Sequence, residues 1–162
     1  MNTLVTFDLD STLADTRWRR GMIQPDGGTD WRAYALACPQ DTLVTSVASL
    51  WGALRPHHSI WVVSGRHVAA RDASVRWLLR HQLQPSGVVL MDPGDGRVTD
   101  TDHCAWKVGA IQSLARSLGK RHVLHVDDYP PVGRACQAAG LECLIVTPPQ
   151  ILEKFEGEGG YV

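Results

Sequence analysis

Lysine, cysteine and long apolar runs are all scarce in this chain of 162 residues. Lysine occurs only at positions 107, 120 and 154, so arginine supplies most of the 16 basic residues, against 17 acidic ones. The resulting net charge of −1 argues against a protein that coats nucleic acid through bulk charge, although it leaves room for a local basic patch. The four cysteines form no C-x-x-C pair, so we expect reduced thiols without a metal.

The sequence also lacks a charged leader before an apolar segment, and no apolar run is long enough to cross a membrane. We therefore expect a cytoplasmic protein without a membrane partner. Its length suits one domain with a core of its own. We assign residues 1–153 to that domain and residues 154–162, which are rich in Glu and Gly, to a flexible tail.

Short segments rich in Val, Ile and Leu alternate with helical patterns along the chain. The alternation predicts an α/β fold, with a mostly parallel five-stranded sheet and helices on both faces. The expected strands are Thr3–Phe7, Ser59–Val63, Gly87–Met91, His122–Val126 and Glu142–Val146. The expected helices are Asp41–Leu54, Val68–Gln82, Asp102–Leu118 and Pro130–Ala139.

Residues 14–40 do not fit this alternation, because they combine Gly, Pro and scattered aromatic residues. We interpret them as an irregular excursion over the active edge of the sheet, with one short helix. Two of their aromatic side chains, Trp18 and Trp31, are expected in the core, with base stacking as the alternative.

Two carboxylates, Asp8 and Asp10, follow the first expected strand, and Ser11-Thr12 supplies a turn. Open α/β sheets bind their ligands at the carboxyl ends of the strands. Two carboxylates at that place can bind a divalent cation and divide nucleophilic and acid–base work. The alternative is a strand end with solvated carboxylates.

Polar residues follow two later strands and begin a later helix. They are Ser64-Gly65-Arg66 after the second expected strand, Lys107 early in the third helix, and Asp127-Asp128 after the fourth strand. Each has a structural alternative: Ser64 and the Asp pair can cap helices, and Lys107 can be a solvated side chain. The histidines at 57, 58, 122 and 125 form no metal motif, so we expect structural roles for them. Core packing alone does not require this set of residues.

In this order and over about 140 residues, the set resembles the four motifs of the haloacid dehalogenase superfamily. Asp8, Asp10 and Thr12 match the Asp-x-Asp-x-Thr loop, and Ser64 matches the hydroxyl at the end of the second strand. Lys107 matches the third motif, and Asp127-Asp128 match the terminal acidic pair. The resemblance implies a Rossmann-like fold with a minimal cap, because no segment is long enough for a large one.

Within that superfamily, the chain looks most like the 3′-phosphatase domains of phage polynucleotide kinase-phosphatases. The features shared with them are Val-Val-Ser-Gly-Arg around Ser64, the Asp-Asp fourth motif, the arginine cluster after the first motif and Gly-Leu-Glu-Cys near the last strand. Arg19 also has the spacing from Asp8 that these phosphatases show.

The resemblance implies a Mg²⁺-dependent phosphomonoesterase. Asp8 is then the nucleophile that forms an aspartyl-phosphate, Asp10 is the acid and base, and Ser64 and Lys107 contact the phosphoryl oxygens. Asp8, the backbone carbonyl of Asp10 and Asp127 hold the metal, while Asp128 is a further metal residue or a partner of Lys107. The implied substrate-binding residues are Thr12, Arg17, Arg19, Gly65 and Arg66.

An open site fits a nucleic acid 3′-phosphate end, or nucleotides, as substrate. The chain has no Walker-type loop, so we expect a separate kinase or ligase as a possible partner. Two alternatives are a phosphatase acting on small nucleotides or sugar phosphates, and a binding module without catalysis.

Two positions depart from the family pattern. Ser11 stands where Gly is common, a change that is tolerable if the local φ stays negative. Asp100, Asp102 and His103 stand where the third motif usually carries acidic residues, and the sequence leaves their roles open.

Overall fold

The computed structural model describes residues 3–24, 28–94 and 99–147, which form one sheet with helices around it. The proposed tail, 154–162, and the proposed domain boundary at 153 lie outside the described residues. The sheet has five parallel strands in the order β5-β4-β1-β6-β7. These strands are β1 (Thr3–Phe7), β4 (Ser59–His67), β5 (Gly87–Met91), β6 (His122–Asp127) and β7 (Glu142–Ile145).

The central strand, β1, pairs with β4 on one side and with β6 on the other. Its residues Leu4–Phe7 are buried whichever face they point to, because helices cover both faces, which is why the strand lacks a regular alternation of apolar and exposed polar residues. The α/β class and the five-stranded sheet predicted from the sequence are confirmed, and in the described residues the sheet is entirely parallel.

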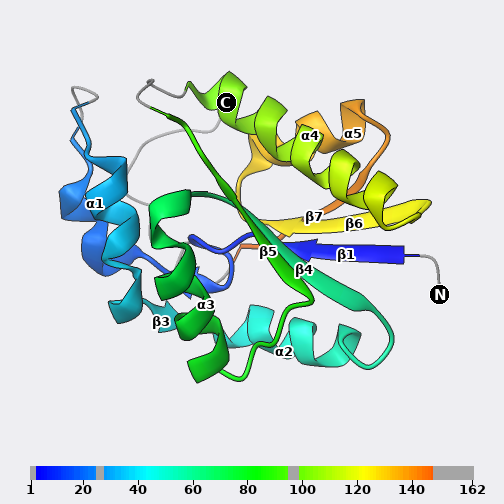
Figure 1. Ribbon diagram of the computed structural model, residues 1–162, viewed down its shortest axis with the longest axis horizontal. Coiled ribbons are helices and arrows are strands. Elements are labelled where there is room, and N and C mark those ends of the chain that lie inside the picture. Colours follow the sequence, from blue (N-terminus) through cyan, green and yellow to red (C-terminus); the bar gives the residue numbers. More distant parts are fainter. Residues whose placement is uncertain (1–2, 25–27, 95–98, 148–162) are drawn as a thin grey trace.

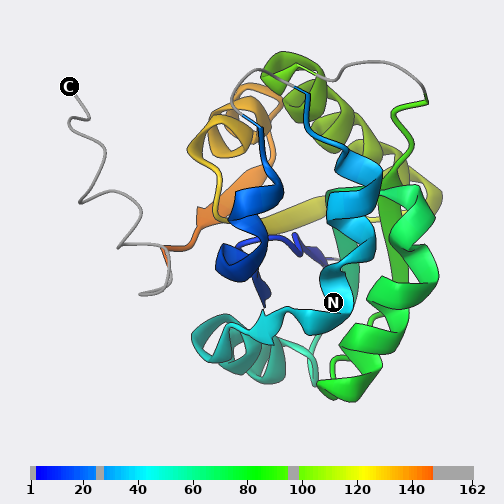
Figure 2. The ribbon, with the colours of Figure 1, turned by 90° about the vertical axis from the view of Figure 1, so that its left-hand side faces the viewer.

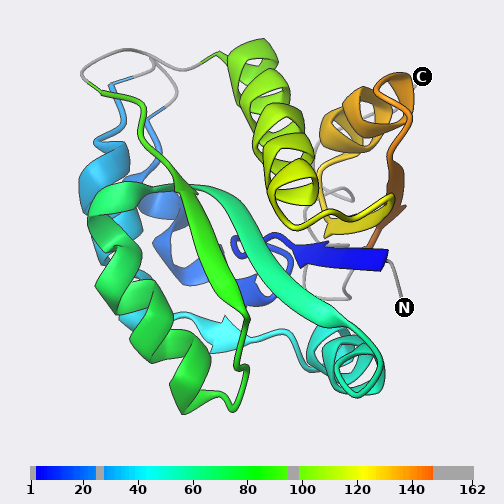
Figure 3. The same ribbon diagram turned by 45° about the vertical axis from the view of Figure 1, so that its right-hand side comes forward.

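Helices α2 (Thr45–Leu54) and α3 (Arg71–Arg80) cover one face of the sheet, and α4 (Asp100–Ser117) and α5 (Pro130–Ala138) cover the other. Figure 1 and Figure 3 show the two pairs on opposite sides of β1. Helix α4 begins with a capping box, in which Thr99 and Asp102 exchange hydrogen bonds, and ends before Gly119 at φ 61°. The capping box therefore fixes the start of the helix that carries Lys107, and Gly119 marks its end.

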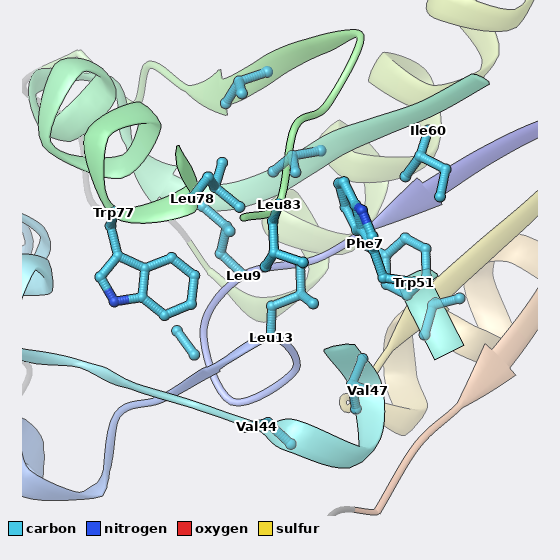
Figure 4. Close-up of a cluster of buried hydrophobic side chains, with 14 of the residues drawn as sticks. Phe7, Leu9, Leu13, Val44, Val47, Trp51, Ile60, Trp77, Leu78 and Leu83 are labelled. Atoms are coloured by element: carbon cyan, nitrogen blue, oxygen red, sulfur yellow. The ribbon is translucent and has the colours of Figure 1, made fainter. Parts of the chain in front are cut away.

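The core under α2 and α3 is aromatic and aliphatic (Figure 4). Phe7 and Trp51 pack with ring centroids 5.1 Å apart, and both are buried. Trp77 packs in the same cluster, and its Nε1 donates to the backbone oxygen of Asp41 at 2.8 Å. Burying such side chains contributes about 1.5–3 kcal/mol each, so this core holds the carboxyl ends of the strands rigidly.

The excursion after β1 is more regular than the sequence suggests. It contains β2 (Ala14–Asp15), η1 (Arg17–Met22), α1 (Trp31–Leu36) and η2 (Cys38–Gln40), and β3 (Thr42–Leu43) follows it directly. β2 and β3 pair antiparallel, so the excursion leaves and re-enters the core at one place. Figure 2, which looks toward the carboxyl ends of the strands, shows η1 and α1 in front of the sheet.

Several expected boundaries shift. The helix predicted from Asp41 begins at Thr45, because Thr42 and Leu43 pair with β2 instead. β4 runs beyond Val63 to His67, with an irregularity in its pairing between Ser64 and His67. The following helix begins as a 3-10 turn, η3 (Val68–Ala70), before α3. No described helix is both long and apolar enough to cross a membrane.

Candidate active site

Asp8, Lys107 and Asp127 form a buried ionic triangle at the carboxyl ends of β1 and β6. Asp8 directly follows β1, and its backbone N–H donates to the Val126 oxygen at 2.9 Å, which extends the β1–β6 ladder by one residue. Lys107 reaches in from α4, where its Nζ lies 3.1 Å from Asp8 Oδ1 and 2.7 Å from Asp127 Oδ2. Lys107 is only 1% exposed, so it is no solvated surface lysine.

Burial and charge act on these three groups in opposite directions. Burial raises the pKa of Asp8, and Lys107 only partly offsets it. Burial lowers the pKa of Lys107, but Asp127 and Asp8 outweigh it and raise the pKa above its usual value. Burial likewise raises the pKa of Asp127, but Lys107 and His125 outweigh it and lower that pKa. Lys107 therefore stays charged between two carboxyl groups.

His125 orients Asp127 from below. It is fully buried in β6, with Nε2 2.9 Å from Asp127 Oδ2 and Nδ1 2.8 Å from Thr6 Oγ1. Sequence reasoning gave His125 a structural role and did not connect it with the site. The available signal was its spacing, because His125 and Asp127 are two residues apart in one strand and share a face.

Asp8, Asp127 and Asp128 each offer a carboxylate oxygen, and these atoms lie within 4.8 Å of one another. Thr12 Oγ1 donates to Asp128 Oδ1 at 2.9 Å and holds that carboxylate toward the other two. Asp8 Oδ1 is buried, and no well-aligned hydrogen bond reaches it in the described part of the chain. An all-carboxylate cluster with an oxygen short of partners fits a hard divalent cation such as Mg²⁺.

Like charge is concentrated at this cluster. Burial raises the pKa of Asp128 to about 7, with Asp8 and Asp127 acting in the same direction. A divalent cation would relieve that repulsion, because it would neutralise the carboxylates that raise the pKa.

Asp10 lies beside this cluster and is held by two arginines. Arg19 Nη2 donates to Asp10 Oδ1 at 2.6 Å, and the Arg66 guanidinium donates to both oxygens of the same carboxylate. Burial alone would raise the pKa of Asp10, but Arg66 and Arg19 outweigh it and lower the pKa to about 2. The Asp10 side chain keeps 25% of its surface exposed, so it remains open to the pocket.

Asp41 completes this network and was missed by the sequence analysis. Its carboxylate accepts hydrogen bonds from Trp18 Nε1 at 2.9 Å, Arg19 Nε at 2.8 Å, Arg19 Nη2 at 2.6 Å and Arg66 Nη2 at 3.2 Å. Its side chain is completely buried. The sequence places Asp41 at the start of an expected helix, where a carboxylate is common, so no local signal distinguished it.

Arg19 and Arg66 thus have protein partners throughout. Arg19 also donates to the backbone oxygen of Tyr34 at 2.8 Å, and its guanidinium lies over the Tyr34 ring at 4.1 Å from the ring centroid. Arg66 also donates to Ser74 Oγ at 3.0 Å. Both side chains are fully buried, so the structure gives them a direct part in holding Asp10 and Asp41.

Arg17 lies apart from this network. It pairs with Asp15, with Nε and Nη2 each about 3 Å from a carboxylate oxygen, and it does not line the pocket described below. Thr12 is buried and its hydroxyl is directed at Asp128, which is an orienting contact within the protein.

Ser64 is buried inside β4, and Gly65 follows it. The helix-capping alternative for Ser64 is wrong, because β4 continues to His67 and His67 caps η3. Ser64 Oγ accepts the Arg66 N–H at 3.3 Å, and the nearby Ser64 hydroxyl lowers the pKa of Asp8 as a minor contribution after burial and charge. A Cβ at Gly65 would lie 2.3 Å from His103 Nε2, so a larger residue there would require the His103 ring to move.

The structure also shows the conformation or the contacts of the residues that depart from the family pattern. Ser11 has φ 65°, so the condition of a negative φ is not met. The reason is the tight turn in which Thr12, Leu13 and Ala14 all donate to the Leu9 oxygen. Asp102 caps α4, and Asp100 accepts a hydrogen bond from the Tyr129 hydroxyl at 3.0 Å.

These groups line one pocket of about 550 Å³. Its floor holds Asp8, Asp10, Ser64, Lys107 and the Asp127-Asp128 pair. One wall comes from α1 and the other from the start of α4 with Tyr129, whose ring stacks at 6.4 Å on His103. Six of the predicted site residues therefore meet at one cavity, together with Gly65 and Arg66, and the excursion closes one side of it.

Sequence comparison finds no matching family model and no matching curated protein. Structure comparison finds similar folds. A chain of the Pnkp1/Rnl/Hen1 complex aligns with a TM-score of 0.68 and 24% identity over 90% of this chain. A chain of the Pnkp1/Rnl/Hen1 RNA repair complex aligns with a TM-score of 0.66 and 24% identity, also over 90%. This chain covers 46% and 42% of those two chains, which is less than half of their length.

A haloacid dehalogenase-family enzyme from Bacteroides thetaiotaomicron, solved with magnesium and inorganic phosphate, aligns with a TM-score of 0.54 and 10% identity. That alignment covers 91% of this chain and 95% of the enzyme. At such identities the comparisons establish the fold. The chain has the haloacid dehalogenase-like fold, as its motifs predict.

Proposed function

We propose that this chain is a Mg²⁺-dependent phosphomonoesterase that forms an aspartyl-phosphate on Asp8 and removes 3′-phosphates from polynucleotide ends. The observation that carries the proposal is the arrangement at the pocket floor. A buried carboxylate, Asp8, faces the cavity beside a buried lysine, a three-carboxylate cluster and a second carboxylate held by two arginines. Each group that phosphoryl transfer needs is present at one place.

In the first step, an Asp8 carboxylate oxygen attacks phosphorus and forms the acyl-phosphate bond. The bond from phosphorus to the ester oxygen breaks, and Asp10 protonates the departing alcohol. Lys107 and Ser64 lie beside Asp8, where they donate to the phosphoryl oxygens as negative charge grows on them.

In the second step, Asp10 takes a proton from water, which attacks phosphorus and releases phosphate and the free Asp8 carboxylate. The two guanidinium groups fix Asp10 at the side of the pocket and favour its ionised form, which is the form that accepts this proton. The proton that Asp10 takes from water is the one it donates to the departing alcohol in the next turnover, and the carboxylate gives up one arginine contact when it accepts that proton.

Asp8, Asp127 and Asp128 would hold Mg²⁺, with the backbone carbonyl of Asp10 as a further ligand in the proposal. The cation supplies positive charge that offsets repulsion between the phosphate and the carboxylates. Thr12 orients Asp128 by a hydrogen bond. Lys107 and His125 orient Asp127 in the same way. The carboxylates of Asp127 and Asp128 are therefore held in place by other side chains of the protein.

The predicted substrate contacts remain proposals. Gly65 provides backbone close to the phosphate, and Arg66 lines the pocket at Asp10. Arg19 acts through Asp10, and we assign Arg17 only a distant contribution to the electric field because it is paired with Asp15.

The 3′-end substrate is supported by the motif resemblance and by the structural similarity to chains in complexes named for Pnkp1, one of them described as an RNA repair complex. We extend the proposal to a partner, either a separate kinase that phosphorylates the 5′ end or a ligase that joins the healed 3′ end. We also propose that the protein acts in the cytoplasm. The proposed catalytic domain is a single domain of residues 1–153.

The test is phosphate release with Mg²⁺ from matched oligonucleotides that carry a 3′- or a 5′-phosphate, beside free 3′- and 5′-nucleotides. Asp8→Asn, which keeps the shape of the side chain, is the blank. We expect release from the 3′-phosphorylated oligonucleotide that is lost in Asp8→Asn. Release that persists in Asp8→Asn would overturn the assignment of the nucleophile.

A phosphatase for small nucleotides or sugar phosphates is the second candidate, because a cavity of about 550 Å³ is within the size range of small-ligand sites. Preference for free nucleotides in the same assay would favour it. A binding module without catalysis would release phosphate from no substrate, and the intact pocket floor argues against that alternative.

A further inference from the structure

The pocket extends well beyond the space that a phosphate needs, and its outer wall carries an exposed tryptophan. Trp31, in the first turn of α1, lines the same cavity as Asp8 and is 52% exposed. Its ring packs edge-on against the buried Tyr34, with centroids 5.5 Å apart and planes at 76°. The ring is therefore anchored from behind while much of its surface faces solvent and the cavity, as a stacking platform requires.

Trp18 provides the contrast within the same excursion. It is 46% exposed, but its Nε1 donates to Asp41 Oδ1 and it does not line the pocket. Of the two tryptophans for which base stacking was an alternative, only Trp31 is placed where a bound ligand would meet it.

Arg32 stands next to Trp31 on the pocket wall. It is exposed, and no ion pair or hydrogen bond of its side chain occurs among residues 3–24, 28–94 and 99–147. Arg17, Arg19 and Arg66, by contrast, are each paired with carboxylates. An unpaired guanidinium at the rim of an anion site is suited to a phosphate group.

Asp8 is buried in the pocket, and Trp31 and Arg32 are exposed on its wall, so groups that extend outward from a phosphate at Asp8 can meet them. A terminal phosphate at Asp8 places its nucleoside farther out, and the preceding phosphodiester farther still. Successive helical residues point about 100° apart, so Trp31 and Arg32 present a ring and a cation to neighbouring parts of one strand.

We propose that Trp31 stacks on the base of the terminal nucleoside and that Arg32 contacts the preceding phosphodiester, so that α1 selects polynucleotide ends. This inference rests on the proposed function and deepens it. It also shifts the expected contacts with flanking phosphates away from Arg17, Arg19 and Arg66, whose charges are already paired.

The test measures binding, so that it does not depend on turnover. The probe is a 5′-fluorescein trinucleotide with a 3′-phosphate, in ribose and deoxyribose forms, titrated with full-length Asp8→Asn protein and Mg²⁺ at several salt concentrations. The added substitutions are Trp31→Ala, Trp31→Phe and Arg32→Gln. The matched controls are Leu36→Ala and Arg121→Gln. Leu36 is exposed on the same helix outside the pocket, and Arg121 is exposed just before β6, at the amino end of the strand and so away from the pocket.

We expect Trp31→Ala to weaken binding about tenfold with an unchanged salt dependence, and Trp31→Phe to retain most of the affinity. Arg32→Gln is expected to weaken binding and to reduce the slope of log affinity against log salt by about 0.7, the value for one phosphate contact on a single strand. Leu36→Ala and Arg121→Gln should bind like the parent.

A second readout separates this inference from the proposed function. Release of phosphate from p-nitrophenyl phosphate by the parent, compared with Asp8→Asn, tests the nucleophile with a substrate that has neither a nucleobase nor a phosphodiester. Parent-like binding of the trinucleotide by both variants, or no binding by any protein, would overturn the inference. Absence of Asp8-dependent release from every phosphate ester would overturn the proposed function instead.

Discussion

Replacing Asp41 with Asn tests the buried ionic network most directly. Asp41 and Asp10 together balance the two guanidinium groups of Arg19 and Arg66, and the Asp41 side chain has no solvent contact. Burial raises the pKa of Asp41, and Arg19 opposes that rise. Asp41→Asn keeps the volume but leaves two buried cations to share one carboxylate, and it directs amide N–H groups at other donors.

Removing one partner from a buried ion pair costs about 3–5 kcal/mol, because the remaining charge stays desolvated. Whole domains are stable by about 5–15 kcal/mol, so this is a large fraction. For a chain of this size, about 2–4 °C of melting temperature is lost per kcal/mol. We therefore expect Asp41→Asn to melt about 6–20 °C below the parent, as followed by circular dichroism.

Asp15→Asn is the matched control. Asp15 also pairs with an arginine, Arg17, but both side chains keep solvent contact, at 11% and 35% exposure. Partly exposed pairs contribute about 0–1 kcal/mol, so we expect a loss of less than about 4 °C. Equal melting temperatures for Asp41→Asn and Asp15→Asn would refute the argument that desolvation makes the Asp41 network strong.

Three further predictions concern the pocket floor and its turn. Mg²⁺ at about a hundred times its Kd should add about 2.7 kcal/mol and raise the melting temperature by about 5–11 °C, and Asp127→Asn should abolish the rise. Gly65→Ala should cost about 1–3 kcal/mol in denaturant unfolding, because its Cβ would meet His103, and adding His103→Ala should recover most of it. Ser11→Val should destabilise the fold by more than about 1 kcal/mol, whereas Ser11→Gly should not, because φ is 65°.

Each of these has a result that contradicts it. A Mg²⁺-dependent rise that survives Asp127→Asn would place the cation elsewhere. An unchanged cost of Gly65→Ala after His103→Ala would show that the glycine is needed for another reason. Equal stability of Ser11→Val and the parent would argue that the turn relaxes to a negative φ.

The fold was predictable because short apolar segments, bounded by turn residues, encode strands that are buried on both faces. The expected Thr3–Phe7 and Gly87–Met91 have the bounds that the structure shows. The expected helix from Asp41 was wrong at its start, because its first residues pair with β2. That pairing joins residues 14–15 to residues 42–43, and no local pattern reports such a contact.

The residues of the candidate site likewise divide into those that local sequence predicts and those that only tertiary contacts reveal. Asp8, Ser64, Lys107 and Asp127 were predictable because parallel strands end at one edge, so residues after different strands converge there. Asp41 and His125 were not assigned to the site, since their importance comes from neighbours distant in sequence or from burial.

The sequence by itself determined the sheet, the helices around it and the chemical types of the groups at the pocket floor, because these depend on local pattern and strand order. Tertiary structure decided how the charges are paired. It buried Arg19 and Arg66 against Asp10 and Asp41, and it left Trp31 and Arg32 on the pocket wall. Pairing depends on which side chains meet after folding, and the energy of a charge depends on the burial that folding imposes.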